Sequence, residues 1–175
     1  MIGSFGYDHI HRVSEALDIA EDLVGNYYKF SLGQWKRHRF DVKTLRALHL
    51  GEITDHALAL LQKGRRTTGQ NDTENFRRET YIICLQDHQI LQAVNRDKRL
   101  NLLPFLVYIF THELIHIVRF CNFMQRFDVP DKEKEKEERV VHERTYEVLK
   151  PLSLSKLDYI LDAYKDHRSI DMVVS

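Results

Sequence analysis

Apolar residues recur at every third or fourth position over most of the chain, which is the spacing of an amphipathic helix. Four segments show this spacing: residues 8–29, 42–63, 131–150 and 155–166. Asp8 and Asp41 stand where they could cap the first two segments, and Gly64 stands where the second would end. The pattern predicts a mainly α-helical protein, with residues 1–175 forming a single domain.

A fifth segment, residues 102–123, is apolar on nearly every side. Pro104 is tolerated in the first turn of a helix, so we expect a helix to begin near it. A helix that is apolar all round is normally buried at the centre of a protein, and this segment is therefore predicted to be the central helix. Its longest uninterrupted apolar run, residues 102–110, is too short to cross a bilayer, so no membrane association is expected.

The segment at residues 76–98 does not fit a single pattern. Residues 81–85 form a short apolar run with β-branched side chains, as in a strand, but the segment also fits helical spacing almost as well. Residues 64–75 are rich in Gly, Thr, Asn and Arg and are predicted to form a loop. Two fold classes stay open: mainly α, or α+β with a short β element near residues 80–86.

The charges of the chain balance. Lysine and arginine together number 26, as do aspartate and glutamate, so no net charge attracts nucleic acid or an acidic membrane. The chain begins with a polar, histidine-bearing segment, so no secretory signal is expected. Its two cysteines, Cys84 and Cys121, form no C-x-x-C motif. A reduced, cytoplasmic setting without a structural disulfide is expected.

His112, Glu113 and His116 form an H-E-x-x-H motif inside the predicted central helix. Positions i and i+4 lie on one face of a helix, so the two histidines can bind one metal ion together. Glu113 projects beside them, where a carboxylate can take a proton from water that the metal activates. Three ionisable residues in an otherwise apolar helix would be costly without such a role, and we therefore expect a metal site.

A hydrolytic zinc site needs a third protein ligand and an open position for water. The extended pattern H-E-x-x-H-x-x-G-x-x-H fails, because Arg119 and Asn122 stand at its last two fixed positions. The helix predicted at residues 131–150 offers Glu138, which lies on the inward-facing stripe of that helix. Glu138 is therefore the expected third ligand.

His142 follows Glu138 by one turn and lies on the same face of the predicted helix. It can orient a metal ligand through a hydrogen bond, or it can be the third ligand itself, since imidazole binds zinc as readily as carboxylate. Other glutamates of this helix stand among lysines and are interpreted as a solvent-exposed charge run. They are Glu133, Glu135 and Glu137.

The motif at residues 112–116, followed 22 residues later by Glu138 on the next helix, resembles the gluzincin branch of the zinc metallopeptidases. The likeness covers residues 104–149, about a quarter of the chain. The resemblance implies a small zincin-like domain, with zinc as cofactor and a peptide or protein as substrate.

The resemblance implies that His112, His116 and Glu138 bind zinc. Glu113 would be the general base, which takes a proton from water and passes it to the leaving amine. The family often has an acidic residue one turn after the glutamate ligand, and this chain has His142 there. The developing oxyanion also needs a donor. The candidates are Tyr108, Tyr146, Arg119, Arg144 and His88, and the sequence does not choose among them.

A helical bundle with a different metal site is an alternative. It would use His112 and His116 with one more histidine from the helix predicted at residues 42–63. That histidine would be His49 or His56. A ferritin-like di-iron site fits less well, because it needs two Glu-x-x-His motifs and the chain has one. The bundle would make the chain a metal-binding protein that is not a peptidase.

A non-catalytic interaction domain is a further alternative. Residues 36–39 and 65–66 are small basic clusters, and Trp35 and Phe40 flank the first of them. Basic residues interleaved with aromatic ones can contact nucleic acid. Since the chain has no net charge and no nucleic-acid-binding motif, solubility of the surface explains these clusters better.

Overall fold

A computed structural model describes residues 3–66, 78–124 and 126–164 of the protein. The helices are α1 (Tyr7–Tyr28), α2 (Leu32–Arg37), α3 (Asp87–Arg96), α4 (Leu102–Cys121), α5 (Asp131–Leu149) and α6 (Leu157–Ala163). The strands are β1 (Phe40–Lys43), β2 (Ala59–Arg66) and β3 (Arg78–Leu85), and two short 3-10 turns, Leu45–Ala47 and Leu50–Glu52, separate β1 from β2. The fold is mainly helical with a small mixed sheet, and the β element predicted near residues 80–86 is confirmed as β3.

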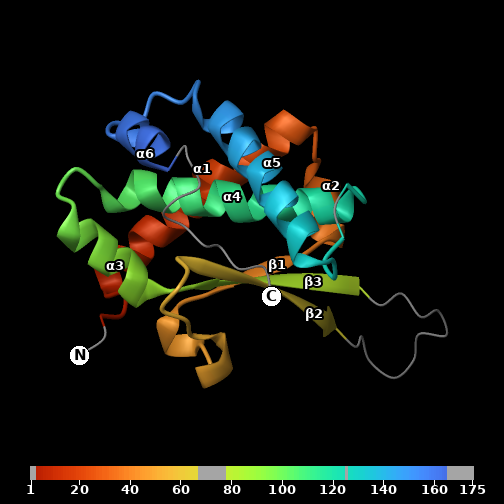
Figure 1. Ribbon diagram of the computed structural model, residues 1–175, viewed down its shortest axis with the longest axis horizontal. Coiled ribbons are helices and arrows are strands. Elements are labelled where there is room, and N and C mark those ends of the chain that lie inside the picture. The colour runs from red at the N-terminus through yellow and green to blue at the C-terminus, as the bar shows by residue number, and fades with distance from the viewer. Residues whose placement is uncertain (1–2, 67–77, 125, 165–175) are drawn as a thin grey trace.

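Helix α4 runs through the middle of the protein, with the other long helices packed around it (Figure 1). Helix α1 packs along it, and α5 crosses it. Every residue from 104 to 118 is buried. The prediction of a central buried helix is therefore confirmed, and it follows from the lack of a continuous polar stripe along this segment.

By length and composition, α4 is also apolar enough to cross a membrane. The prediction against this used only the run at residues 102–110, whereas the whole helix has 20 residues. Most of α4 is buried inside the protein, which is also what a central core helix shows. Packing against the neighbouring helices therefore accounts for its apolar character.

The faces that α1 and α5 turn toward the core follow the predicted stripes. On α1 the buried residues are Val13, Ala16, Ala20 and Val24, spaced by three or four positions. On α5 they are Val141, His142, Thr145, Val148 and Leu149. The helices predicted at residues 8–29 and 131–150 are confirmed to within one residue at each end. Helix α6 covers the middle of the one predicted at residues 155–166.

The sheet has the strand order β1-β3-β2, with β1 parallel and β2 antiparallel to the central strand β3. Tyr81 and Ile83 of β3 belong to the main core that the helices share. Cys84, which points the opposite way, packs against Ala57 and Leu60 in a second, smaller cluster. The helices lie over one face of the sheet, and the turns between β1 and β2 lie on its other side (Figure 1).

The helix predicted for residues 42–63 is wrong, because this segment forms the end of β1, two 3-10 turns and the first part of β2. Gln86 holds the connection between them in an extended form. Its side-chain oxygen accepts a hydrogen bond from the Thr54 amide at 2.9 Å, and its side-chain nitrogen donates to the Glu52 carbonyl at 2.9 Å. Pairing with β3 satisfies backbone groups that a helix would have paired internally, so tertiary contacts override the helical spacing.

Gly64 does not end an element, because it lies inside β2 and pairs with Thr80 of β3. The strand continues to Arg66. The loop predicted at residues 64–75 falls mostly on residues 67–77, which lie outside the described part of the chain.

Asp87 begins α3 and ties two other segments to it. Its buried carboxylate accepts hydrogen bonds from the Phe5 amide at 2.8 Å and from the Leu45 amide at 3.0 Å. Asp87→Asn is expected to lower the free energy of unfolding by about 2 kcal/mol, because the amide nitrogen of Asn leaves one of these N–H groups without an acceptor. Urea denaturation measures this loss. Asp18→Asn, on the exposed face of α1, is the control, and a loss of equal size there would contradict the prediction.

Candidate metal centre

Helix α4 places His112 and His116 one turn apart on the face that α5 approaches. Both side chains are completely buried, and their Nε2 atoms are 3.2 Å apart. Phe120, one turn further along, stacks on the His116 ring with centroids 6.2 Å apart. The i, i+4 spacing thus brings two imidazole nitrogens to one point, and the next turn supports the second ring.

Helix α5 brings Glu138 to the same point from the other side. Its Oε2 lies 3.2 Å from Nε2 of His112, and its Oε1 lies 3.0 Å from Nε2 of His116. Within the described part of the chain, these three residues are the group of His, Cys, Asp or Glu side chains whose ligand atoms converge, all within 4.8 Å of one another. Residues far apart in sequence therefore meet in a His-His-Glu group.

The spacing of these atoms suits a small tetrahedral ion. Zinc binds imidazole nitrogen and carboxylate oxygen at about 2.0–2.2 Å, so neighbouring ligands of a tetrahedral site stand about 3.3–3.5 Å apart. The closest separations in the group are 3.0 to 3.2 Å. An outward shift of a few tenths of an ångström would admit the ion, and the donor set of two imidazoles and one carboxylate is one that zinc accepts.

Glu138 is the least buried member of the group. The side chain of Glu138 is 22% exposed, whereas the two histidines are completely buried. The Oε2 atom of Glu138, which faces His112, is buried as well. Three protein ligands leave a fourth position for water, which is the composition of a catalytic zinc site.

The electrostatics of the group favour an ionised ligand at Glu138. Burial alone would raise the pKa of Glu138, but the imidazoles of His116 and His112 hold this pKa well below its usual range. A metal binds the carboxylate form. The candidate third ligand is therefore already in the protonation state that metal binding requires.

Glu113 stands next to His112 on α4 and is almost completely buried. Burial raises the pKa of Glu113 to about 7, with His116 opposing the rise and Glu138 adding to it. A carboxylate that titrates near neutrality can both accept and return a proton near pH 7. The two carboxylates of the centre thus have environments that push their pKa values apart, which separates a ligand from a base.

His142 lies beside the centre and not within it. Its ring centroid is 4.7 Å from that of His112, and its Nδ1 is hydrogen-bonded to the Tyr108 hydroxyl at 3.0 Å. Among the described residues, the converging group contains Glu138 and not His142. The geometry therefore favours Glu138 as third ligand, with His142 and Tyr108 restricting the orientation of the His112 ring.

Glu137 differs from the prediction for it. The sequence predicted that Glu137 belongs to a solvent-exposed charge run. Its side chain is instead only 15% exposed, and it accepts a hydrogen bond from Nε of Arg119. Arg119 is thereby engaged with α5, one turn after the ligand His116. Sequence reasoning missed this pair, although Glu137 directly precedes Glu138. By contrast, Glu133 and Glu135 are exposed as predicted.

Breaking the pair between Arg119 and Glu137 is expected to weaken zinc binding by about 10-fold or more. The pair joins α4 to α5 beside Glu138, and without it the carboxylate loses a support that sets its distance from the histidines. Glu137→Ala tests this through zinc affinity, measured by competition with a chromophoric chelator. Glu135→Ala, at an exposed position of the same helix, is the matched control. Equal zinc affinity in the two variants would exclude the positioning role.

Two of the candidates for oxyanion stabilisation interact with residues of α5 itself or just beyond it. The Lys150 ammonium lies over the Tyr146 ring at 5.7 Å, and Arg144 forms an ion pair with Glu147 at 2.9 Å. Neither contact involves the His-His-Glu group. Tyr108 hydrogen-bonds to His142, whose ring packs on His112 of that group.

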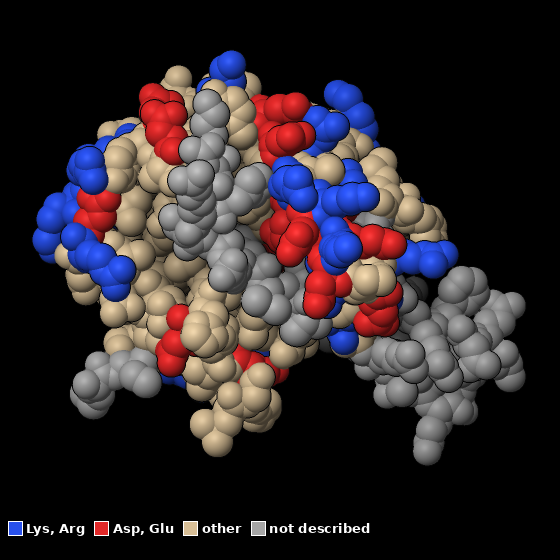
Figure 2. Space-filling view, viewed as in Figure 1, with Lys and Arg blue, Asp and Glu red and all other residues tan. Residues whose placement is uncertain are grey.

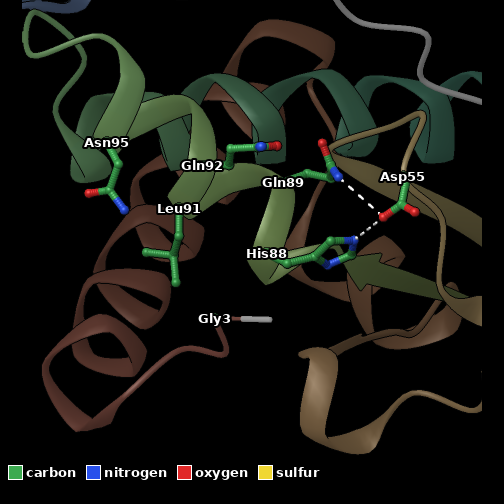
Figure 3. A pocket seen from close by; sticks show the side chains of 7 residues that line it. All are labelled: Gly3, Asp55, His88, Gln89, Leu91, Gln92 and Asn95. Carbon is green, nitrogen blue, oxygen red and sulfur yellow. Dashed lines mark hydrogen bonds and ion pairs between the residues drawn. The ribbon is translucent and has the colours of Figure 1, made fainter. Parts of the chain in front are cut away.

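His88, a third candidate, belongs to α3 and lines a separate pocket (Figure 3). Its Nε2 lies 2.9 Å from Oδ1 of Asp55, and the Gln89 amide donates to the same oxygen at 3.3 Å. Figure 3 shows these three side chains meeting at one end of the pocket. His88 is therefore not a neighbour of the candidate metal centre.

The helical-bundle alternative needs a helix at residues 42–63, and this helix does not form. His49 and His56 lie at exposed positions between β1 and β2, and neither belongs to a helix. Neither belongs to the converging group found in the described residues. Because the helix predicted at residues 42–63 does not form, His49 and His56 are not carried to His112 and His116 by a neighbouring helix.

The aromatic residues beside the first basic cluster serve the core. Trp35 is buried, with its ring edge-on to Phe30 at 4.6 Å and to Phe40 at 5.6 Å. This segment therefore does not present an exposed Trp35 ring on which a base could stack. The side chains of the second cluster, residues 65–66, lie outside those described.

Comparisons of the chain with protein-family models, with curated proteins and with solved structures find no match. The class of the protein is therefore defined by its fold and its candidate site. It is a mainly helical protein with a small mixed sheet, and its described residues contain a His-His-Glu group that could hold a metal ion.

Proposed function

We propose that the protein is a zinc-dependent metallohydrolase, and specifically a small metallopeptidase with a zincin-like arrangement. The observation that carries the proposal is the convergence of the ligand atoms of His112, His116 and Glu138. The buried carboxylate of Glu113 beside them adds a general base. The order of elements supports the same conclusion, because α4 carries the motif and the following helix, α5, carries the third ligand.

The residues of the candidate centre would have separate roles in binding zinc and in proton transfer. His112 and His116 would hold zinc through their Nε2 atoms and Glu138 through its carboxylate, and the bound ion would supply Lewis-acid activation of water and of the substrate carbonyl. Glu113 would accept a proton from the attacking water and donate it to the leaving amine. The expected substrate is a peptide or protein.

A cytoplasmic setting is part of this proposal. Cys84 is buried and Cys121 half-buried, and they form no disulfide with each other. Burial raises the pKa of Cys84 to about 11, so this thiol stays protonated and unreactive near neutral pH. A reducing compartment is compatible with both residues.

Metal content per chain is the experiment that tests the proposal. Elemental analysis of tag-free protein, purified without added metal, is expected to find about one zinc per chain, followed by hydrolysis in a peptidase screen. About two iron or manganese ions per chain would point to a carboxylate-bridged centre instead. If the protein binds no metal even when zinc is offered, the His-His-Glu group is a hydrogen-bonded structural cluster and the proposed function is wrong.

A further inference from the structure

Helix α4 ends in a backbone motif that normally requires glycine. Phe123, just after the last turn, has a left-handed φ of 57°. Its amide donates to the Phe120 carbonyl at 3.1 Å, and the Met124 amide donates to the Arg119 carbonyl at 2.9 Å. This is the pair of hydrogen bonds of a Schellman motif, in which the left-handed position is usually occupied by Gly or sometimes Asn.

The aromatic ring of Phe123 has no compensating role in the core. A bulky residue with positive φ is strained, since its Cβ crowds the backbone. Burial of the ring could offset the strain, but Phe123 is 94% exposed. The other non-glycine residues with positive φ in the described chain are Lys29 and Lys156, both of which carry side chains suited to water. Folding alone would therefore favour Gly at position 123.

Phe123 stands at the rim of a groove of about 390 Å³. Met124 and Val129 give the groove an apolar side, and α5 contributes Lys136 and Glu137. Met124 is 54% exposed, so two large apolar side chains lie in solvent next to each other. Adjacent exposed apolar residues beside a groove are typical of a binding surface.

The groove lies on α5 next to the position of Glu138, a member of the candidate metal centre. Glu137 lines the groove and directly precedes Glu138, about 1.5 Å along the helix axis. Arg119, which binds Glu137, lies one turn after His116 on α4. The groove is thus lined by α5, which carries Glu138, and by the segment that joins α4 to α5.

The charges around the groove are of both signs. Arg126 and Lys136 line it together with Glu133 and Glu137. Figure 2 shows Lys and Arg side chains interspersed with Asp and Glu over the face that α5 forms. Such a surface does not select a polyanion such as nucleic acid, but it suits a polypeptide, whose backbone carries no net charge.

We propose that this groove, with Phe123 at its rim, binds an extended segment of the polypeptide substrate through a large apolar side chain. The inference rests on the proposed function and names the substrate class: unfolded polypeptide with exposed apolar residues. Phe123 lowers the stability of the fold but contacts that segment. This contact explains why an exposed aromatic ring stands at a position where glycine is favoured.

Phe123→Gly separates the two roles. The variant is expected to raise the melting temperature by about 2–4 °C, because the strain is relieved, and to weaken binding of fluorescein-labelled casein by about 10-fold. Binding is measured by fluorescence anisotropy on zinc-treated protein that also carries Glu113→Gln, so that the probe is not cleaved. Phe123→Tyr, which keeps an aromatic ring, should retain binding. Leu50→Ala, at a residue 91% exposed on the turn before β2, is the control that should change neither quantity.

Casein binding that is equal in the Phe123→Gly variant and its parent would overturn the inference, and so would a melting temperature that falls. If light scattering shows a dimer that Phe123→Gly converts to a monomer, the occupant is a second copy of the chain and the substrate inference is wrong. Zinc content is measured on the same samples. A protein that lacks zinc but loses casein binding on Phe123→Gly would refute the proposed hydrolase while leaving the groove as a polypeptide-binding surface.

Discussion

Replacing Glu113 with Gln is expected to leave zinc bound while peptide hydrolysis slows by about 10²–10⁴-fold. Gln has nearly the shape of Glu, but its amide does not accept a proton at neutral pH, so the general base is lost. The proposed ligands His112, His116 and Glu138 are unchanged. Zinc content by elemental analysis and initial rates on labelled casein are the two measurements, made on the same preparation.

Stability provides an independent check on this variant. Burial raises the pKa of Glu113 to about 7, so the ionised form is costly where it stands, and a neutral Gln should not lower the free energy of unfolding. Glu143→Gln, at an exposed position on α5, is the matched control and should leave zinc and hydrolysis unchanged. Full hydrolytic activity in the Glu113 variant would remove this residue from the reaction, and loss of its zinc would make it a ligand.

Replacing Glu138 with Ala is expected to lower zinc affinity by at least about 100-fold, because one of three protein ligands is removed and the effect should exceed that of an outer contact. The loss should also appear in stability. At a free zinc concentration about 100 times the Kd, zinc should stabilise the unaltered protein by about 2.7 kcal/mol, and the variant should gain much less. Zinc titrations and denaturation with and without zinc measure both effects.

Two companion variants make this test specific to the third ligand. Glu135→Ala, at an exposed position of the same helix, should bind zinc as the unaltered protein does. His142→Ala removes a ring that packs on His112 but does not belong to the converging group, so a smaller loss of affinity is expected. If the His142 variant loses zinc and the Glu138 variant keeps it, His142 is the third ligand and the assignment must be reversed.

Much of the candidate site could be predicted from local spacing. His112 and His116 converge because residues four apart on a helix share a face, and this holds wherever the helix is placed. Glu138 was predicted from the apolar stripe of its own helix. The contact between the two helices could not be derived this way, because it depends on how α5 crosses α4. The ion pair of Arg119 with Glu137 was missed for the same reason. The sequence of a charge run is the same whether all of its side chains are exposed or one of them is buried against another helix.

The fold shows where local patterns stop being sufficient. Helices α1, α4 and α5 have stripes or an all-round apolar surface long enough to specify a helix, and they were predicted almost to the residue. Residues 42–63 have apolar spacing that fits a helix equally well, yet they form strands and turns. Their conformation depends on hydrogen bonds to residues distant in sequence, above all to β3 and to the buried Gln86 side chain.

By itself, the sequence determined the three long helices α1, α4 and α5, and it determined that His112 and His116 share one face of α4, because both follow from the 3.6-residue period of a helix. Only the tertiary structure decided that Glu138 meets His112 and His116, that Glu137 is covered by Arg119, and that residues 42–63 join a sheet. These outcomes depend on packing and on backbone pairing between segments far apart in the chain, and no local period encodes them.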